Sequence, residues 1–124
     1  MLLLDAISQA IFDKKGANII TIDVRGISTM TDFYVIAEGN VERHVKAIHN
    51  SVCDAMEKNG RRPLFIEGVR ESDWVVIDFG DVVIHLLIPE MRERYALENL
   101  WKDGKIVDVN IVVDNKIPSQ ATSI

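Results

Sequence analysis

Residues 74–85, WVVIDFGDVVIH, set two aspartates and a histidine into an otherwise apolar run. Asp78, Asp81 and His85 are residue types that bind divalent metals or transfer protons, so this run is a candidate for catalytic or metal chemistry. The alternative is a buried β-hairpin whose polar side chains serve the structure or a partner. The choice between these interpretations decides whether the chain is an enzyme.

The dipeptide Gly80–Asp81 predicts a two-residue hairpin turn, because glycine supplies the positive φ that such a turn requires. The turn sets the strand register, and side chains then alternate between the two faces. The opposed pairs are Asp78 with Val83, Ile77 with Ile84, Val76 with His85, and Trp74 with Leu87. One face is wholly apolar: Val75, Ile77, Phe79, Val82, Ile84 and Leu86. Burying this face against helices would gain on the order of 10 kcal/mol before entropy is subtracted.

The other face of the hairpin mixes apolar and polar groups. It carries Trp74, Val76, Asp78, Val83, His85 and Leu87. A large aromatic residue among polar neighbours is typical of a protein interface, so we expect this face to dock a partner. Asp81 lies in the turn, where it can bond to its own backbone.

Catalysis and metal binding at the hairpin are less favoured interpretations. Asp78 and His85 are diagonal neighbours, with Cα atoms roughly 7–8 Å apart, and no serine or cysteine nucleophile is nearby. Only two of the three candidate metal ligands share a face, whereas a metal site needs three or four convergent ligands. A metal site and a purely structural polar network both stay open at this point.

The overall composition narrows the class of protein. The chain has 124 residues, one domain by size, with a net charge of −5 and a single cysteine, Cys53. The acidic balance argues against a nucleic-acid surface and favours a basic partner. One cysteine excludes an internal disulfide, and the N-terminal stretch is a poor signal peptide. We therefore expect an intracellular, cytoplasmic protein with no membrane span, an inert Cys53 thiol, and solvated His44 and His49.

Hydrophobic periodicity predicts an α+β domain with a mixed sheet of about five strands. Helices are expected at 2–15, capped by Gly16, and at 41–59, capped by Asn40, with helical turns at 90–101. Strands are expected at 17–24, 33–37 and 64–67 and in the hairpin. The strand at 33–37, the long helix and the strand at 64–67 are predicted to form a right-handed crossover. The residues after Gly104 suggest an edge strand or a loosely held tail.

Four segments in a fixed order resemble the ribosomal silencing factor family, also called the Iojap family. They are TDFYVIAEG, VERHVKAI, EGVRESDWVVIDFGDVVIHLL and RERYALENLW. The resemblance covers about residues 2 to 103, so we expect a silencing-factor domain at 1–104 and a C-terminal extension at 105–124. It implies a nucleotidyltransferase-like α+β fold without the catalytic residues. The chain has Gly39–Asn40 before its long helix and only Glu67 in the following strand, where an active transferase would have Gly-Ser or Gly-Gly and a pair of carboxylates.

The resemblance implies a function and a partner. Family members bind the large ribosomal subunit through its fourteenth protein and prevent joining with the small subunit, which represses translation when nutrients are scarce. Organellar relatives act in ribosome assembly, and several members form homodimers. No enzymatic activity, cofactor, metal or direct nucleic-acid contact is expected. Large-subunit assembly is the alternative function, and a metal-dependent phosphotransferase or hydrolase is the less favoured one.

The resemblance also assigns roles to individual residues. Trp74, Asp78, Asp81 and His85 match the hairpin motif of the family, and with Val83 and the loop residues Glu67 and Gly68 they are the predicted partner-binding set. A second motif provides structural or secondary contacts through Arg92, Tyr95, Leu97, Glu98 and Trp101. We expect Tyr95, Leu97 and Trp101 mainly to dock their segment on the sheet.

Overall fold

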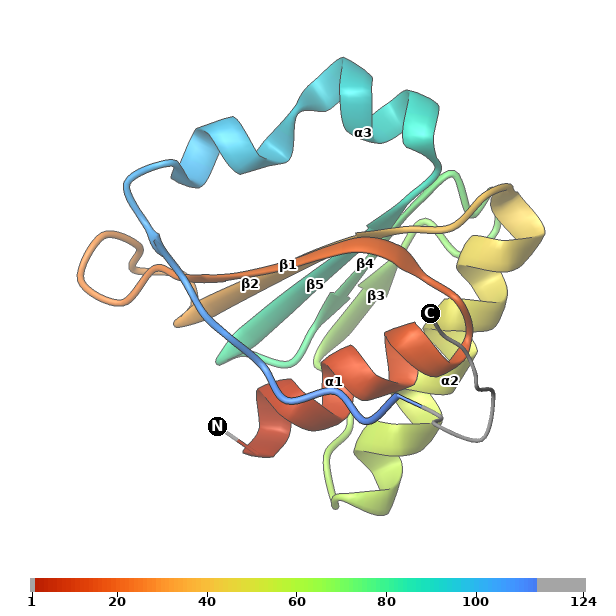
Figure 1. Cartoon of the computed structure of the whole chain (residues 1–124), viewed down its shortest axis with the longest axis horizontal. Coiled ribbons are helices and arrows are strands. Elements are labelled where there is room, and N and C mark those ends of the chain that lie inside the picture. The colour runs from red at the N-terminus through yellow and green to blue at the C-terminus, as the bar shows by residue number, and fades with distance from the viewer. Residues whose placement is uncertain (1, 114–124) are drawn as a thin grey trace, which may run out of the picture.

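A computed structural model describes residues 2–113 of the chain (Figure 1). In order, the elements are α1 (Leu2–Asp13), β1 (Ala17–Asp23), β2 (Phe33–Glu38), α2 (Glu42–Lys58), β3 (Phe65–Glu67), β4 (Trp74–Asp78), β5 (Val82–Leu87), α3 (Pro89–Tyr95), the 3-10 helix η1 (Leu97–Trp101) and β6 (Lys105–Ile106). The α+β class is confirmed. None of the helices in this described range is long and apolar enough to cross a membrane.

The strands form one six-stranded sheet in the order β3-β4-β5-β2-β1-β6. β2 and β5 are parallel, and the other neighbours are antiparallel. The predicted crossover from β2 through α2 to β3 does join two parallel strands of one sheet, but β5 and β4 lie between them, so β2 pairs with β5 rather than with β3. β3 is only three residues long and exposed throughout, which suits the sheet edge, whereas β5 is almost wholly buried on both faces and suits the centre.

The hairpin register is confirmed at each predicted pair between Trp74↔Leu87 and Asp78↔Val83. The wholly apolar face lies against α1 and α2, which cover one side of the sheet (Figure 1). All of its side chains are at most 4% exposed: Val75, Ile77, Phe79, Val82, Ile84 and Leu86. Leu4, Ile7 and Ile11 of α1 and Val45 and Ile48 of α2 are among the residues that pack against it in this core.

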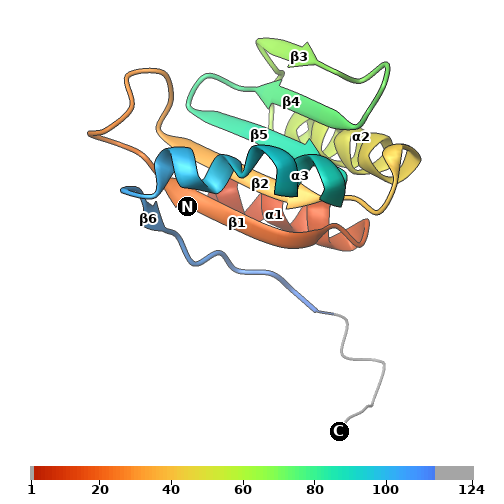
Figure 2. The same cartoon turned by 90° about the horizontal axis from the view of Figure 1, so that it is seen from above.

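The opposite side of the sheet is covered in part by α3 and η1. Figure 2 shows these two helices lying above β2, β5 and β1, with β3 and β4 extending beyond them. A second, smaller core lies beneath them and includes Ile22, Tyr34, Ile36, Leu87 and Leu97. One face of the sheet is therefore covered except at the β3 edge, where Ile66 is 41% exposed, and the other face is half covered.

Two helix caps differ from the prediction. The left-handed residue after α1 is Lys15, with φ 63°, and not Gly16. Position 16 instead requires glycine because a side chain would collide with α1: a Cβ there would lie 2.4 Å from Ile11 Cγ2. Val41 is the N-cap of α2 and provides no side-chain hydrogen bond, so the predicted Asn40 cap is also wrong.

His44 ties the start of α2 to the end of α1. Its Nδ1 accepts a hydrogen bond of 2.8 Å from the Asn40 N–H, and its Nε2 lies 2.6 Å from the Lys14 carbonyl oxygen. Since Nδ1 is an acceptor, Nε2 carries the proton and donates to that carbonyl. The prediction of a solvated His44 is therefore wrong, because both ring nitrogens have protein partners.

The chain after Gly104 forms an edge strand and then an extended segment along α1. β6 pairs with β1, and the Val107 N–H donates to the Thr21 carbonyl. Further on, the Asn110 N–H donates to Asp5 Oδ1 at 2.9 Å, and Gln9 exchanges two hydrogen bonds with Val112. The rest of the predicted C-terminal extension, residues 114–124, lies outside the described range.

Candidate functional site

The helix-covered half of the second sheet face holds an aromatic cluster. Trp101 of η1 stacks on Tyr34 of β2, with ring centroids 3.6 Å apart and planes 13° from parallel. His85 lies beside both rings, at 5.9 Å from Tyr34 and 5.7 Å from Trp101. Leu97 is 5% exposed in the same layer. Trp101 and Leu97 thus pack their segment onto the sheet.

Trp74 and His85 share a hydrogen bond within this cluster. The indole Nε1–H donates to His85 Nδ1 at 3.0 Å, and His85 is only 9% exposed. Burial lowers the pKa of His85 to about 4, so the ring is neutral at pH 7 and its Nδ1 is free to accept. The expectation of an open docking face that includes His85 is wrong, because α3 and η1 cover this ring. Its hydrogen bond to the indole orients Trp74, which does reach the surface.

Trp74 marks the boundary between the covered and uncovered halves. It is half-buried, and its ring lies 4.9 Å from that of Tyr95 at an angle of 43°. Tyr95, at the end of α3, is 49% exposed. The pair therefore presents an aromatic ridge at the edge of the helical cover, with a fixed orientation for Trp74.

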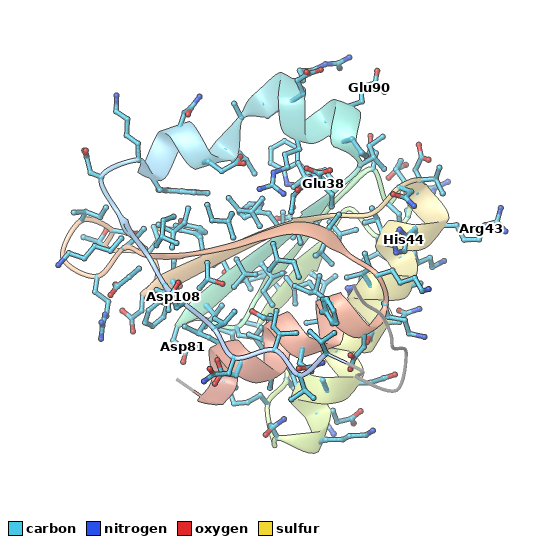
Figure 3. The ribbon with its side chains drawn as sticks, in the orientation of Figure 1. Glu38, Arg43, His44, Asp81, Glu90 and Asp108 are labelled. Carbon is cyan, nitrogen blue, oxygen red and sulfur yellow. The ribbon has the colours of Figure 1, made fainter. Side chains whose placement is uncertain are left out.

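Arg92 anchors α3 to the sheet. Its guanidinium lies 3.3 Å from a carboxylate oxygen of Glu38 in β2 and 2.9 Å from one of Glu98 in η1, and its side chain is 10% exposed. It also donates to the carbonyl of Asn18. Figure 3 shows Glu38 between α3 and the sheet, where this contact forms. Arg92 and Glu98, predicted as structural contacts, lie in a partly buried ionic network.

The uncovered half is what we call the open face: Phe65, Glu67, Trp74, Val76, Asp78 and Tyr95. The strand pairing puts Phe65 next to Asp78 and Glu67 next to Val76, so these side chains emerge on the same side of the sheet as Trp74. Phe65 is 68% exposed, and Figure 2 shows no helix above β3. The open face combines large apolar groups with carboxylates, which is the chemistry that fits a basic protein partner.

The remaining predicted residues lie in the loop between β3 and β4, at the hairpin turn and in the second core. Gly68 has φ 86°, and a Cβ there would lie 2.1 Å from the Trp74 carbonyl oxygen, so the loop requires glycine. Asp78 Oδ1 accepts the Gly80 N–H at 2.7 Å. Asp81 pairs with Arg61 at 2.6 Å rather than with its own backbone, at the opposite end of the sheet from Glu38 (Figure 3). Val83 is half-buried in the second core.

The sequence pattern did not single out Phe65, and it predicted structural or secondary contacts for Tyr95, mainly to dock its segment on the sheet. The signal for Phe65 was the run Leu64–Ile66, three consecutive large apolar residues in a strand that is too short for the sheet centre. All three are exposed, at 67%, 68% and 41%. Tyr95 could not be placed because its exposure depends on where α3 ends.

The polar groups of the hairpin are engaged in structural hydrogen bonds. In the described range, 2–113, no group of three or more His, Cys, Asp or Glu side chains is arranged to bind a metal ion. On α2, Cys53 Sγ lies 3.8 Å from His49 Nδ1, but burial raises the pKa of the thiol and lowers that of the imidazole. Both shifts oppose a thiolate–imidazolium pair. His49 is 7% exposed, so its predicted solvation is wrong.

Comparison with known proteins identifies the family. The family model described as "Ribosomal silencing factor during starvation" matches residues 2–123, which include the segment after Gly104 that the resemblance had left outside. A ribosomal silencing factor of Bacillus subtilis is 35% identical over 108 residues, covering 87% of this chain and 92% of the relative. A mouse protein named "Mitochondrial assembly of ribosomal large subunit protein 1" is 36% identical over 101 residues, covering 79% of this chain and 44% of its own length.

Solved structures agree with the sequence relatives. A crystal structure of a Chromobacterium violaceum protein has a TM-score of 0.79 at 30% identity, covering 96% of this chain and 97% of the other. A crystal structure of a protein from Bacillus halodurans has a TM-score of 0.77 at 34% identity. The match covers 87% of this chain and 98% of the other. The nucleotidyltransferase-like description of the fold stays a prediction. By the family model, the sequence relatives and the shared fold, this chain belongs to the ribosomal silencing factor (Iojap) family.

Proposed function

We propose that this protein is a non-enzymatic silencing factor of the cytoplasm that binds the large ribosomal subunit through its fourteenth protein. The bound protein then sterically blocks the large subunit from joining the small subunit, and this represses translation when nutrients are limiting. The observation that carries this proposal is the open face, an acidic and aromatic surface on a chain of net charge −5. No cofactor or metal takes part.

The open face has the chemistry that such a contact needs. Large-subunit proteins are typically basic, and Glu67 and Asp78 supply carboxylates beside the apolar anchors Phe65 and Trp74. Aromatic anchors at the centre of an interface carry most of its binding energy. A standard interface buries about 800 Å² per partner, which a domain of this size can present. Steric exclusion requires no further chemistry, because an occupied face cannot receive the small subunit.

The predicted partner-binding residues divide into direct and indirect roles in this proposal. Glu67, Trp74 and Asp78 touch the partner together with the newly found Phe65 and Tyr95. His85 acts through its hydrogen bond to Trp74. The others shape or border the contact: Gly68, Asp81 and Val83.

Co-sedimentation and subunit joining test the proposal. The purified protein is expected to sediment with isolated large subunits and to slow their pairing with small subunits, measured by light scattering. Phe65→Asp should weaken binding at least tenfold, or about 1.4 kcal/mol. Ile106→Asp is the matched control, because Ile106 is 63% exposed on the opposite edge of the sheet.

The outcomes separate the parts of the proposal. Failure to sediment with large subunits overturns it altogether. Sedimentation without any effect on joining removes the silencing mechanism and leaves binding. Equal loss of binding in both variants shows that the open face is not the contact.

A role in large-subunit assembly is the second candidate function. It is favoured by the similarity to the mouse protein named for mitochondrial assembly of the large subunit. Gradient profiles of depleted cells distinguish the two functions. Accumulated large-subunit precursors support assembly, whereas loss of translational repression in starved cells with normal subunit profiles supports silencing.

A further inference from the structure

β3 leaves its outer edge without a strand partner in the described range. It is the terminal strand of the sheet, and within residues 2–113 its one strand partner is β4 (Figure 2). We propose that a basic, extended segment of the large-subunit partner adds to β3 as a further strand and continues the sheet. This inference rests on the proposed function and specifies how the partner is held.

β3 contains no lysine, proline or bulge and is exposed along its length, although it is only three residues long. Natural edge strands carry lysine or proline, are bulged or are covered, because an open edge pairs with other chains. β3 reads Phe-Ile-Glu, and the residue before it is Leu64. The opposite edge differs, since β6 has only two residues and one of them is Lys105. The two edges of one sheet are therefore protected to different degrees.

The backbone of β3 is already held in the extended form. It pairs with β4 from Phe65↔Asp78 to Glu67↔Val76, and the Leu64 N–H donates to the Asp78 carbonyl at 2.7 Å. At the other end, Gly68 turns the chain tightly against the Trp74 carbonyl. Because the edge is ordered before binding, a partner strand gains its backbone hydrogen bonds without first ordering β3.

Charge selects the occupant of this edge. Residues 64–81 contain five carboxylates, Glu67, Glu71, Asp73, Asp78 and Asp81, against the single cation Arg70. Arg61, which pairs with Asp81, and Arg62 precede this stretch, so residues 61–81 keep an excess of two negative charges. A second copy of this chain would bring the same excess of negative charge to the edge and repel it. An extended segment with lysines or arginines fits beside Glu67, and its apolar side chains fit beside Phe65.

Hydrogen exchange tests the proposal on the backbone itself. The probe is the purified fourteenth large-subunit protein, mixed with the full-length chain. An edge strand directs alternate amides outward, so at least one amide of β3 should exchange rapidly in the free protein. In the complex, that amide is expected to slow at least a hundredfold. The amides of β6, on the opposite edge, serve as the internal control and should not change.

A proline variant then removes the outward donor. Proline at the β3 position whose amide exchanges rapidly leaves the hydrogen bonds to β4 intact, so unfolding should remain cooperative at nearly the same temperature. The dissociation constant is expected to rise at least tenfold. The matched control is an alanine at the same position, which keeps the amide and removes the side chain.

Each outcome has a distinct meaning. Absence of any complex for the wild type overturns the proposed function and this inference with it. A complex in which β3 amides exchange as before, or in which the proline variant binds like the alanine variant, overturns strand addition and leaves side-chain docking on the open face. Concentration-dependent protection of β3 without the probe assigns the edge to a second copy and also overturns the proposal.

Discussion

The hydrogen bond from Trp74 to His85 links the surface chemistry of the protein to a buried titratable group. The indole needs an acceptor, and only the neutral imidazole offers one at Nδ1. Protonation would direct an N–H of His85 against the N–H of Trp74 inside an aromatic cluster. The orientation of Trp74 at the open face therefore depends on His85 remaining neutral.

This dependence predicts a loss of stability in mild acid. The pKa of His85 is lowered from 6.5 to about 4 in the folded protein, so the unfolded chain binds the proton first. The free energy of unfolding should be unaffected above about pH 6.5 and should fall between about pH 6.5 and 4, by up to roughly 3 kcal/mol. Urea denaturation at a series of pH values measures it.

The variant His85→Asn provides the control for this titration. The amide oxygen of asparagine can replace Nδ1 as the acceptor for the indole, but it does not titrate. The difference in unfolding free energy between wild type and variant should shrink or reverse as the pH falls. If both proteins lose stability in parallel over this range, His85 is not the group responsible, and the buried His49 becomes the next candidate.

At the scale of elements, α3 is held by charge more than by apolar burial. It has no buried residue of its own, whereas Arg92 reaches Glu38, Glu98 and the Asn18 carbonyl. Arg92→Met should cost roughly 2–4 kcal/mol, because it leaves largely buried carboxylates without a counter-charge. Adding Glu38→Gln should recover part of this loss. Chemical denaturation of the single and double variants checks the coupling, and additive losses would contradict a shared network.

The junction of α3 and η1 contains a strained residue. Ala96 has φ 44° and ψ 54°, the left-handed region that costs a residue with a Cβ roughly 1–2 kcal/mol. Ala96→Gly should relieve this strain, and the gain is partly offset by the greater freedom of glycine in the unfolded chain. We expect the melting temperature to stay equal or rise by a few degrees. A clear decrease in thermal unfolding would show that the Ala96 methyl group contributes packing that outweighs the strain.

At the scale of the whole molecule, the sequence predicted local features better than long-range ones. The hairpin register followed from Gly80–Asp81 and from strict alternation, both of which are local. The parallel pairing of β2 with β5 and the cover over His85 depend on contacts between distant segments, and no short pattern encodes them. The two helix caps were mispredicted although the contacts concerned are local: the Asn40 N–H donates to His44 Nδ1 four residues on, and a Cβ on Gly16 would collide with Ile11 in the preceding turn.

The charge distribution of the whole chain predicts how binding responds to salt. With a net charge of −5 and a basic partner, association should be accelerated by long-range attraction. The screening length falls from about 10 Å at 0.1 M salt to about 3 Å at 1 M, so the association rate should fall on the order of tenfold while dissociation changes less. Surface-plasmon kinetics with immobilised large subunits measure both rates.

The association rate should depend on where the charges lie as well as on the net charge. Glu67→Gln with Glu71→Gln removes two exposed carboxylates near β3, and Asp103→Asn with Asp108→Asn removes two at the opposite edge of the sheet. Both double variants have the same net charge, so any difference between them reports location. We expect the first to reduce the association rate and its salt dependence more strongly. Equal effects would mean that net charge alone steers the encounter, and a rate that rises with salt would contradict a basic partner.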